Sequence, residues 1–141
     1  MEVNILYTAE ATATGGRGGH SRSSDGVLDL NLSVPAEMGG TAEVGGTNPE
    51  QLFAAGYAAC FNGAMAVAAQ RLKVSVEGSE VTAKVSIGRG GEGGFGLAVE
   101  LIAKIPGLER EKAVELVEMT HHICPYSNAT RGNVDVKLTV I

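Results

Sequence analysis

The chain has 141 residues, of which 44% are apolar, 19% charged and 4% aromatic, and its net charge is −5 at neutral pH. This length fits a single domain, residues 1–141, and the apolar content is too high for a disordered chain. The acidic balance argues against nucleic-acid binding, and the scarcity of charged side chains to cover the surface favours burial against a second copy of the chain.

The first 45 residues are predicted to form strands and turns. Residues 3–7 are strand-like, residues 15–19 form a glycine-rich loop around Arg17, and residues 26–34 alternate between apolar and polar as a half-buried strand does. Pro35 ends this strand. Because no cationic leader precedes an apolar run at the N-terminus, we expect the protein to stay in the cytoplasm.

A long helix is predicted to follow, ending near Leu72. Its start has two capping solutions: Asn48 as the N-cap with Pro49 at the first helical position, or a capping box of Thr47 and Glu50. Residues 51–70 carry no charge and have the length of a membrane span. Their Ala- and Gly-rich composition, with Asn and Gln, instead predicts a helix buried in protein and no membrane partner.

The second half of the chain reads as strand, strand, helix, strand. Residues 81–87 and 95–105 are predicted strands joined by a hairpin loop, residues 109–122 form an amphipathic helix, and residues 134–141 alternate as a final strand. Pro125 cannot continue the second helix regularly. The order predicts an α+β fold, with an antiparallel sheet packed on two central helices that form the core.

Cys60 lies in the middle of the long helix, on a stripe that also contains Phe53, Gly56, Tyr57, Ala64 and Val67. One interpretation is a buried core cysteine that packs as a small apolar side chain. The other is a reactive thiol. An apolar pocket raises the pKa of a thiol, so a reactive Cys60 needs a fixed cation nearby.

A second cysteine, Cys124, follows the second helix and would continue the stripe of Ala113, Val117 and Thr120 if the helix reaches it. Both thiols would then face the core between the helices. Disulfides in the cytoplasm are seldom structural and are more often catalytic or sensory. The pair therefore favours redox chemistry over simple packing.

Arg17 is the candidate cation, because the glycines on both sides allow its backbone to approach a site closely. Glu50 could hold the guanidinium through a bidentate ion pair. A solvated loop arginine and a capping glutamate are the simpler alternatives. Glu50 and Cys60 lie about 15 Å apart along the helix axis, so one arginine reaches both more easily across two chains. This spacing suggests a two-fold dimer in which Arg17 and Glu50 of one chain complete the site around Cys60 of the other.

A metal site is the competing arrangement. His121, His122, Cys124 and Cys60 supply four ligand types, but their spacing matches no standard zinc pattern, and adjacent histidines on a helix point about 100° apart. The sequence therefore predicts neither a metal nor another cofactor.

Three segments resemble a known family. They are residues 16–20 (GRGGH), 48–61 (NPEQLFAAGYAACF) and 124–133 (CPYSNATRGN), and they closely resemble the organic hydroperoxide resistance proteins of the OsmC/Ohr superfamily. The resemblance covers nearly the whole chain, and the two cysteine segments are specific to the family.

The resemblance implies an intertwined homodimer with two central helices, sheets outside and shared active sites. It implies that Cys60 attacks the peroxide and Cys124 resolves the product, with Arg17 and Glu50 supporting the thiolate. The implied substrates are alkyl and fatty-acid hydroperoxides, and the implied reductant is a lipoylated protein or dihydrolipoamide. An apolar rim of Phe53, Phe61 and Tyr126 would suit an alkyl tail. Two alternatives stay open: an OsmC-type peroxidase of different peroxide preference, and a non-catalytic redox sensor.

Overall fold

The computed structural model describes residues 2–141, and its contacts divide them into two compact units, residues 2–49 and residues 50–141. The first unit contains the strands β1 (Ala11–Thr14), β2 (His20–Ser23) and β3 (Asp29–Asn31) and two short 3-10 turns, η1 (Gly16–Gly18) and η2 (Ala36–Met38). The three strands form an antiparallel sheet in the order β1-β2-β3. Arg17 lies in η1, in the turn between β1 and β2, where Gly15 and Gly16 both have positive φ.

Two strand predictions in this unit are wrong. Residues 3–7 form no regular element, and their backbone has no strand pairing. Only residues 29–31 of the predicted strand 26–34 belong to β3. The reason is a turn. Asp25 accepts hydrogen bonds from Ser23 Oγ and the Val27 backbone, and Gly26 has φ 76°. This turn takes up residues that the apolar alternation assigns to the strand.

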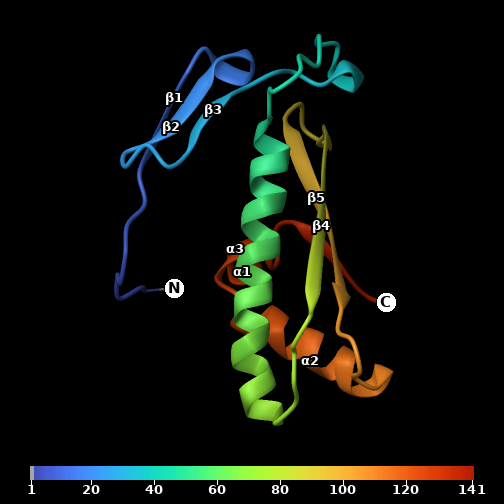
Figure 1. The fold of residues 1–141 in the computed structure, drawn as a ribbon. Helices are drawn as coiled ribbons and strands as arrows, with labels where there is room; N and C mark the ends of the chain where they lie inside the picture. Colours follow the sequence, from blue (N-terminus) through green and yellow to red (C-terminus); the bar gives the residue numbers. More distant parts are fainter. Residues whose placement is uncertain (1) are drawn as a thin grey trace. The chain divides into compact units, whose positions relative to one another are not determined.

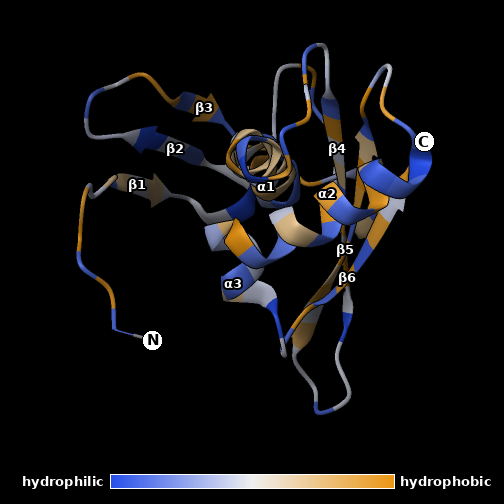
Figure 2. Ribbon diagram, turned by 90° about the horizontal axis from the view of Figure 1, so that it is seen from below, coloured by the Kyte–Doolittle hydropathy of each residue, from blue (hydrophilic) through white to orange (hydrophobic). Residues whose placement is uncertain are grey.

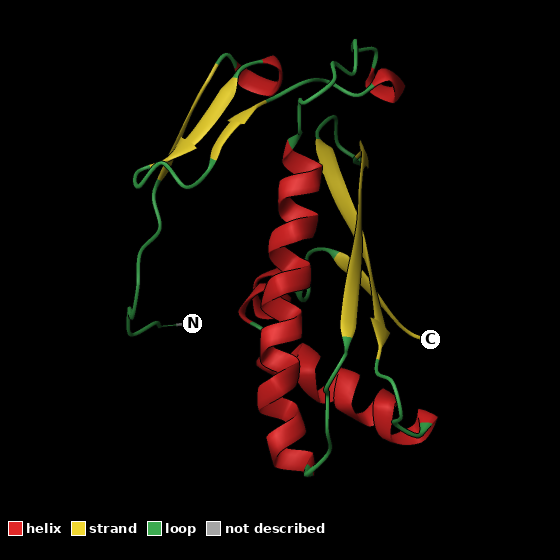
Figure 3. Ribbon diagram, viewed as in Figure 1, coloured by secondary structure: helices red, strands yellow, loops and turns green. Residues whose placement is uncertain are grey.

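The second unit is built on α1 (Pro49–Leu72), a helix of 24 residues. It begins at Pro49, which agrees with Asn48 as the N-cap residue and Pro49 at the first helical position. The backbone of Thr47 forms an isolated bridge with Leu32, and its capping box with Glu50 stays a prediction. The remaining elements are β4 (Glu80–Arg89), β5 (Phe95–Lys104), α2 (Arg110–Ile123), α3 (Pro125–Thr130) and β6 (Asp135–Val140). Figures 1 and 3 show α1 running beside the β4–β5 hairpin.

The second sheet is mixed, in the order β4-β5-β6, whereas the sequence predicted an antiparallel sheet. β4 and β5 form the expected antiparallel hairpin, but β6 runs parallel to β5. Two parallel strands need a crossover connection, and α2 and α3 provide it. The helix α3 is also absent from the sequence prediction, because Pro125 was expected only to end α2. In the structure Pro125 begins the next helix, a position that proline favours.

The core lies between the sheet and the helices, and not between the two long helices alone. Alternate β5 residues Val99, Leu101 and Ala103 are buried together with one face of α1 and the inner face of α2. The buried residues of α1 are Tyr57, Phe61, Ala64, Met65, Ala68 and Ala69. Apolar residues occur all around α1 when it is viewed end on (Figure 2).

α1 is long and apolar enough to cross a membrane by length and composition, with a mean hydropathy of 1.5 over its most apolar window. A third of that window is buried inside the chain. Six of its side chains belong to the core of the second unit, as the sequence predicted for a helix buried in protein.

Candidate active site

The two cysteines come together in the second unit. Cys60 lies on α1 and is partly buried, while Cys124 is fully buried and separates α2 from α3. The thiol of Cys124 points at the sulfur of Cys60, with 3.6 Å between the two Sγ atoms. Both cysteines are free thiols in this structure. A disulfide has an S–S length of about 2 Å, so a small movement would join them.

Cys124 reaches this position because the chain changes direction there. Its backbone N–H donates to the Thr120 carbonyl as the last hydrogen bond of α2, and its own carbonyl accepts from the Asn128 N–H of α3. The residue itself has an extended conformation, with φ −60° and ψ 123°. A break of one residue, set by Pro125, therefore turns the Cys124 side chain towards α1.

Burial raises the pKa of the Cys60 thiol, and a backbone hydrogen bond from Tyr126 lowers it in part. The neighbouring Cys124 thiol raises the Cys60 pKa further. Within a single chain the thiolate of Cys60 is therefore less populated at neutral pH than that of an exposed cysteine. The sequence argument that a reactive Cys60 needs a cation agrees with this direction of shift.

A buried hydroxyl cluster lies beside the cysteines. The Tyr57 hydroxyl of α1 is 2.7 Å from Ser127 Oγ and 3.2 Å from Thr130 Oγ1, both in α3. Ser127 Oγ also lies 2.8 Å from His121 Nδ1 in the last turn of α2. Burial lowers the pKa of His121, and the charges of Arg131 and His122 lower it further. The cluster ties three helices together at one point.

Three aromatic rings cover the helix surface next to Cys60. Phe53, Tyr57 and Tyr126 contact one another, with ring centroids 5.8 to 6.4 Å apart. Tyr126 is 43% exposed and Phe53 is partly buried, so both could border a substrate pocket. Phe61 lies fully buried in the core, so it could contact a substrate only from beneath. The assignment of all three to substrate binding stays a prediction.

Gly56 allows the Tyr126 ring to lie against α1. A Cβ at Gly56 would lie 3.3 Å from the Tyr126 ring, which is tight enough that the ring must shift by a few tenths of an ångström. Gly91, in the loop between β4 and β5, has open space around its Cα.

We expect Gly56→Ala to displace Tyr126 and lower the rate at which Cys60 reacts with a bulky alkyl hydroperoxide by about threefold or more. Gly91→Ala is the matched control, because it adds the same methyl group at an exposed loop position where nothing lies within 4 Å of the added carbon. Stopped-flow rates and thermal unfolding of both variants test this. Equal rates for the two variants would show that Tyr126 packing does not shape the pocket.

Arg17 and Glu50 have separate locations in the chain. Arg17 is partly buried in η1 of the first unit, and Glu50 lies in the first turn of α1, ten residues before Cys60. Their predicted support of the Cys60 thiolate stays a prediction.

The metal alternative finds no support among residues 2–141, which contain no group of three or more His, Cys, Asp and Glu side chains able to hold a metal ion. His121 is directed at Ser127, and the His121 and His122 rings are tilted by 58° relative to each other. The two histidines therefore do not converge with the cysteines.

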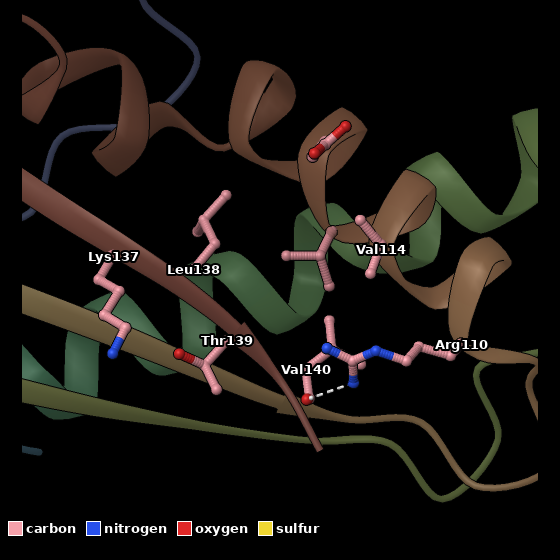
Figure 4. A pocket seen from close by; sticks show the side chains of 8 residues that line it. Arg110, Val114, Lys137, Leu138, Thr139 and Val140 are labelled. Carbon is pink, nitrogen blue, oxygen red and sulfur yellow. Dashed lines mark hydrogen bonds between the residues drawn. The ribbon is translucent and has the colours of Figure 1, made fainter.

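A cavity of about 360 Å³ lies elsewhere in the second unit, between α2 and β6. Figure 4 shows its apolar walls, Val114 and Leu138 among them, and Arg110, which donates a 3.1 Å hydrogen bond to the Val140 carbonyl. Neither cysteine lines it. The cavity therefore lies apart from the thiol pair.

Sequence reasoning placed Tyr57 on the Cys60 stripe but missed its hydroxyl contacts and Ser127. The spacing of these residues along the chain could have indicated the contact between Tyr57 and Ser127. Tyr57 and Cys60 are three residues apart on α1, and Cys124 and Ser127 are three residues apart after α2. Matching offsets on two facing helical segments indicate paired contacts.

Comparison with known proteins identifies close relatives. The model of the family described as "OsmC-like protein" matches residues 39–139. An organic hydroperoxide resistance protein of Xanthomonas axonopodis pv. citri is 56% identical over 137 residues, which cover 96% of this chain and 95% of the relative.

Solved structures agree with this relationship. An organic hydroperoxide resistance protein from Legionella pneumophila superposes with a TM-score of 0.90 at 52% identity, covering 97% of this chain and 98% of that one. The corresponding protein of Vibrio cholerae, with captopril bound in one of its active sites, has a TM-score of 0.92 at 50% identity and covers 99% and 95% of the two chains.

Proposed function

Because the chain belongs to the OsmC-like family and is closely related to its organic hydroperoxide resistance proteins, we propose that it is a cysteine-dependent peroxidase that reduces organic hydroperoxides to alcohols. The observation that carries this proposal is the 3.6 Å separation of the Cys60 and Cys124 sulfurs beside exposed aromatic surface. A thiol pair at this distance can pass from a sulfenic acid to a disulfide with little movement.

The reaction begins with the Cys60 thiolate attacking the terminal oxygen of the hydroperoxide. The S–O bond forms as the O–O bond breaks, Cys60 becomes a sulfenic acid, and the alkoxide takes up a proton to leave as the alcohol. The Cys124 sulfur then attacks the Cys60 sulfur. The S–S bond forms, the S–O bond breaks, and the hydroxide leaves with the Cys124 proton as water.

An external dithiol completes the cycle by exchange, which returns both cysteines to thiols and leaves the dithiol oxidised. On the family resemblance, that dithiol is a lipoylated protein or dihydrolipoamide. Cys124 is buried and Cys60 is partly exposed, so the incoming thiolate has access to the Cys60 sulfur of the disulfide. No metal or other cofactor takes part in these steps.

The raised pKa of Cys60 requires a cation, and we assign this role to Arg17, held by Glu50. The proposed assembly is an intertwined homodimer in which each site draws on both chains, and in which both units of the chain form one OsmC/Ohr-like domain. Its location is the cytoplasm. An exposed stripe of small residues on α1, formed by Ala55, Ala59, Gly63 and Ala66, supports close approach of a second α1.

The substrate preference is tested by stopped-flow oxidation of the reduced protein with tert-butyl hydroperoxide and with hydrogen peroxide. We expect the organic peroxide to react at least about a hundredfold faster, because the aromatic surface favours an alkyl tail by roughly 1.5 to 3 kcal/mol per buried apolar group. Turnover should follow with dihydrolipoamide. Comparable rates would favour a different peroxide preference, and oxidation without turnover would favour a redox sensor.

A further inference from the structure

We propose that Tyr57 is a positioning residue for the Cys60–Cys124 disulfide, acting through its hydrogen bonds to α3. This inference rests on the proposed redox pairing of the two cysteines. Tyr57 contributes no atom to the proposed attack on peroxide, which uses the Cys60 sulfur. Its hydroxyl is fully buried, yet it bonds two side chains of a different helix.

The geometry places two contacts side by side along α1. Tyr57 and Cys60 are three residues apart and therefore share a face, about 4.5 Å apart along the helix axis. Cys60 contacts Cys124, and Tyr57 contacts Ser127, which lies three residues after Cys124. The Tyr57 bond thus anchors the segment that carries Cys124 one turn of helix away from the sulfur contact.

The same anchor controls the short turn that begins α3. This helix has six residues, and isolated helices of that length do not form stably in water. The buried residues of α3 are Ser127 and Thr130, and the side-chain hydroxyls of both are hydrogen-bonded to the Tyr57 hydroxyl. Without this anchor, the Cys124–Pro125–Tyr126 turn would sample more positions, and Cys124 would spend less time within reach of Cys60.

We expect Tyr57→Phe to fold, because both hydrogen-bond partners of the Tyr57 hydroxyl have a second partner. Thr130 Oγ1 keeps its 3.2 Å hydrogen bond to the Ser127 carbonyl, and Ser127 Oγ keeps its hydrogen bond with His121 Nδ1. The phenyl ring keeps its packing in the core and against Phe53 and Tyr126. The variant therefore removes the hydrogen-bonded link between α1 and α3 without leaving a buried side-chain group unpaired.

The direct test is the equilibrium between the reduced and disulfide forms in glutathione redox buffers, which measures how strongly the fold favours pairing of the two thiols. We expect Tyr57→Phe to lower this equilibrium constant by about five- to tenfold, the effect of losing a buried hydrogen bond. Ser127→Ala should lower it in the same direction but by less, because the Tyr57 hydroxyl keeps Thr130 Oγ1 at 3.2 Å. The double variant should be little worse than Tyr57→Phe alone, because Tyr57→Phe already removes the bond to Ser127.

Thr120→Val is the matched control. Thr120 is also fully buried near Cys124, but its hydroxyl bonds the Leu116 carbonyl of its own helix at 2.7 Å. The dithiol–disulfide equilibrium constant of Thr120→Val should stay within about twofold of the wild-type value, even if the unfolding temperature of the variant falls. An unchanged equilibrium in Tyr57→Phe and Ser127→Ala, or an equal loss in Thr120→Val, would overturn the proposal.

A kinetic measurement separates this inference from the proposed function. After one equivalent of tert-butyl hydroperoxide, Tyr57→Phe should form sulfenic acid at nearly the wild-type rate, form the disulfide about five- to tenfold more slowly, and accumulate more Cys60 sulfinic acid by mass spectrometry. If the wild type failed to reduce peroxide while Tyr57→Phe still shifted the glutathione equilibrium, the peroxidase function would be wrong and the positioning role would stand.

Discussion

Cys60→Ser is expected to abolish the reaction with tert-butyl hydroperoxide, lowering the rate on the order of a thousandfold or more, because a serine hydroxyl is a far weaker nucleophile than a thiolate. Stopped-flow measurement of peroxide consumption by the reduced protein gives this rate. The change is nearly isosteric and the residue is only partly buried, so unfolding temperature should move little. Retained peroxide consumption would assign the chemistry to another residue.

Cys124→Ser is the natural control for this experiment, because it alters the other member of the pair at the same site. It should consume about one equivalent of peroxide and then stop, since Cys60 would remain as a sulfenic acid without a thiol 3.6 Å away. Mass spectrometry should find the sulfenic and over-oxidised forms of Cys60. Normal turnover with dihydrolipoamide would contradict the resolving role of Cys124.

Loss of the Arg17 guanidinium is expected to have the second large effect on peroxide reactivity. Arg17→Ala should lower peroxide reactivity at neutral pH by at least about tenfold and move its pH profile upward, because burial raises the Cys60 pKa and the compensating cation is lost. With the thiolate as the reactive form, activity should recover as pH rises. Cys60→Ser homodimers should be inactive at every pH.

If the sites are shared, mixing Arg17→Ala chains with Cys60→Ser chains should restore activity. In a mixed dimer, the intact Cys60 of the first chain would meet the intact Arg17 of the second. Co-expression with two different affinity tags isolates these dimers, and their activity should approach half that of wild type. The control is a dimer carrying both substitutions on one chain and none on the other. Inactive mixed dimers beside an active control would place Arg17 and Cys60 of one site in the same chain.

Much of the architecture could be predicted from the sequence, because the signals were local. The run Asn48-Pro49 marks the beginning of α1 within a residue, and the strict alternation of residues 81–87 identifies the core of β4. The stripe around Cys60 and the position of Cys124 after the second helix were enough to predict that the thiols face a common core. The separation of 3.6 Å between their sulfurs confirms that they meet.

Other features depend on contacts between distant segments. Apolar alternation could not show that β6 runs parallel to β5, because strand direction is set by the α2–α3 crossover and not by side-chain pattern. Pro125 is compatible with either the end of one helix or the start of the next, and packing of Ser127 and Thr130 on Tyr57 accompanies the second outcome.

By itself, the sequence determined the α+β class, the two long helices and the candidate thiol pair, since these follow from periodicity, capping and residue type along the chain. Only the tertiary structure decided how the pair is held. The Cys60–Cys124 distance and the link from Tyr57 to Ser127 join residues 64 and 70 positions apart. Such contacts exist only after α1 and the α2–α3 turn pack against each other, because burial in that packing excludes the water that would otherwise bond the Tyr57 and Ser127 hydroxyls.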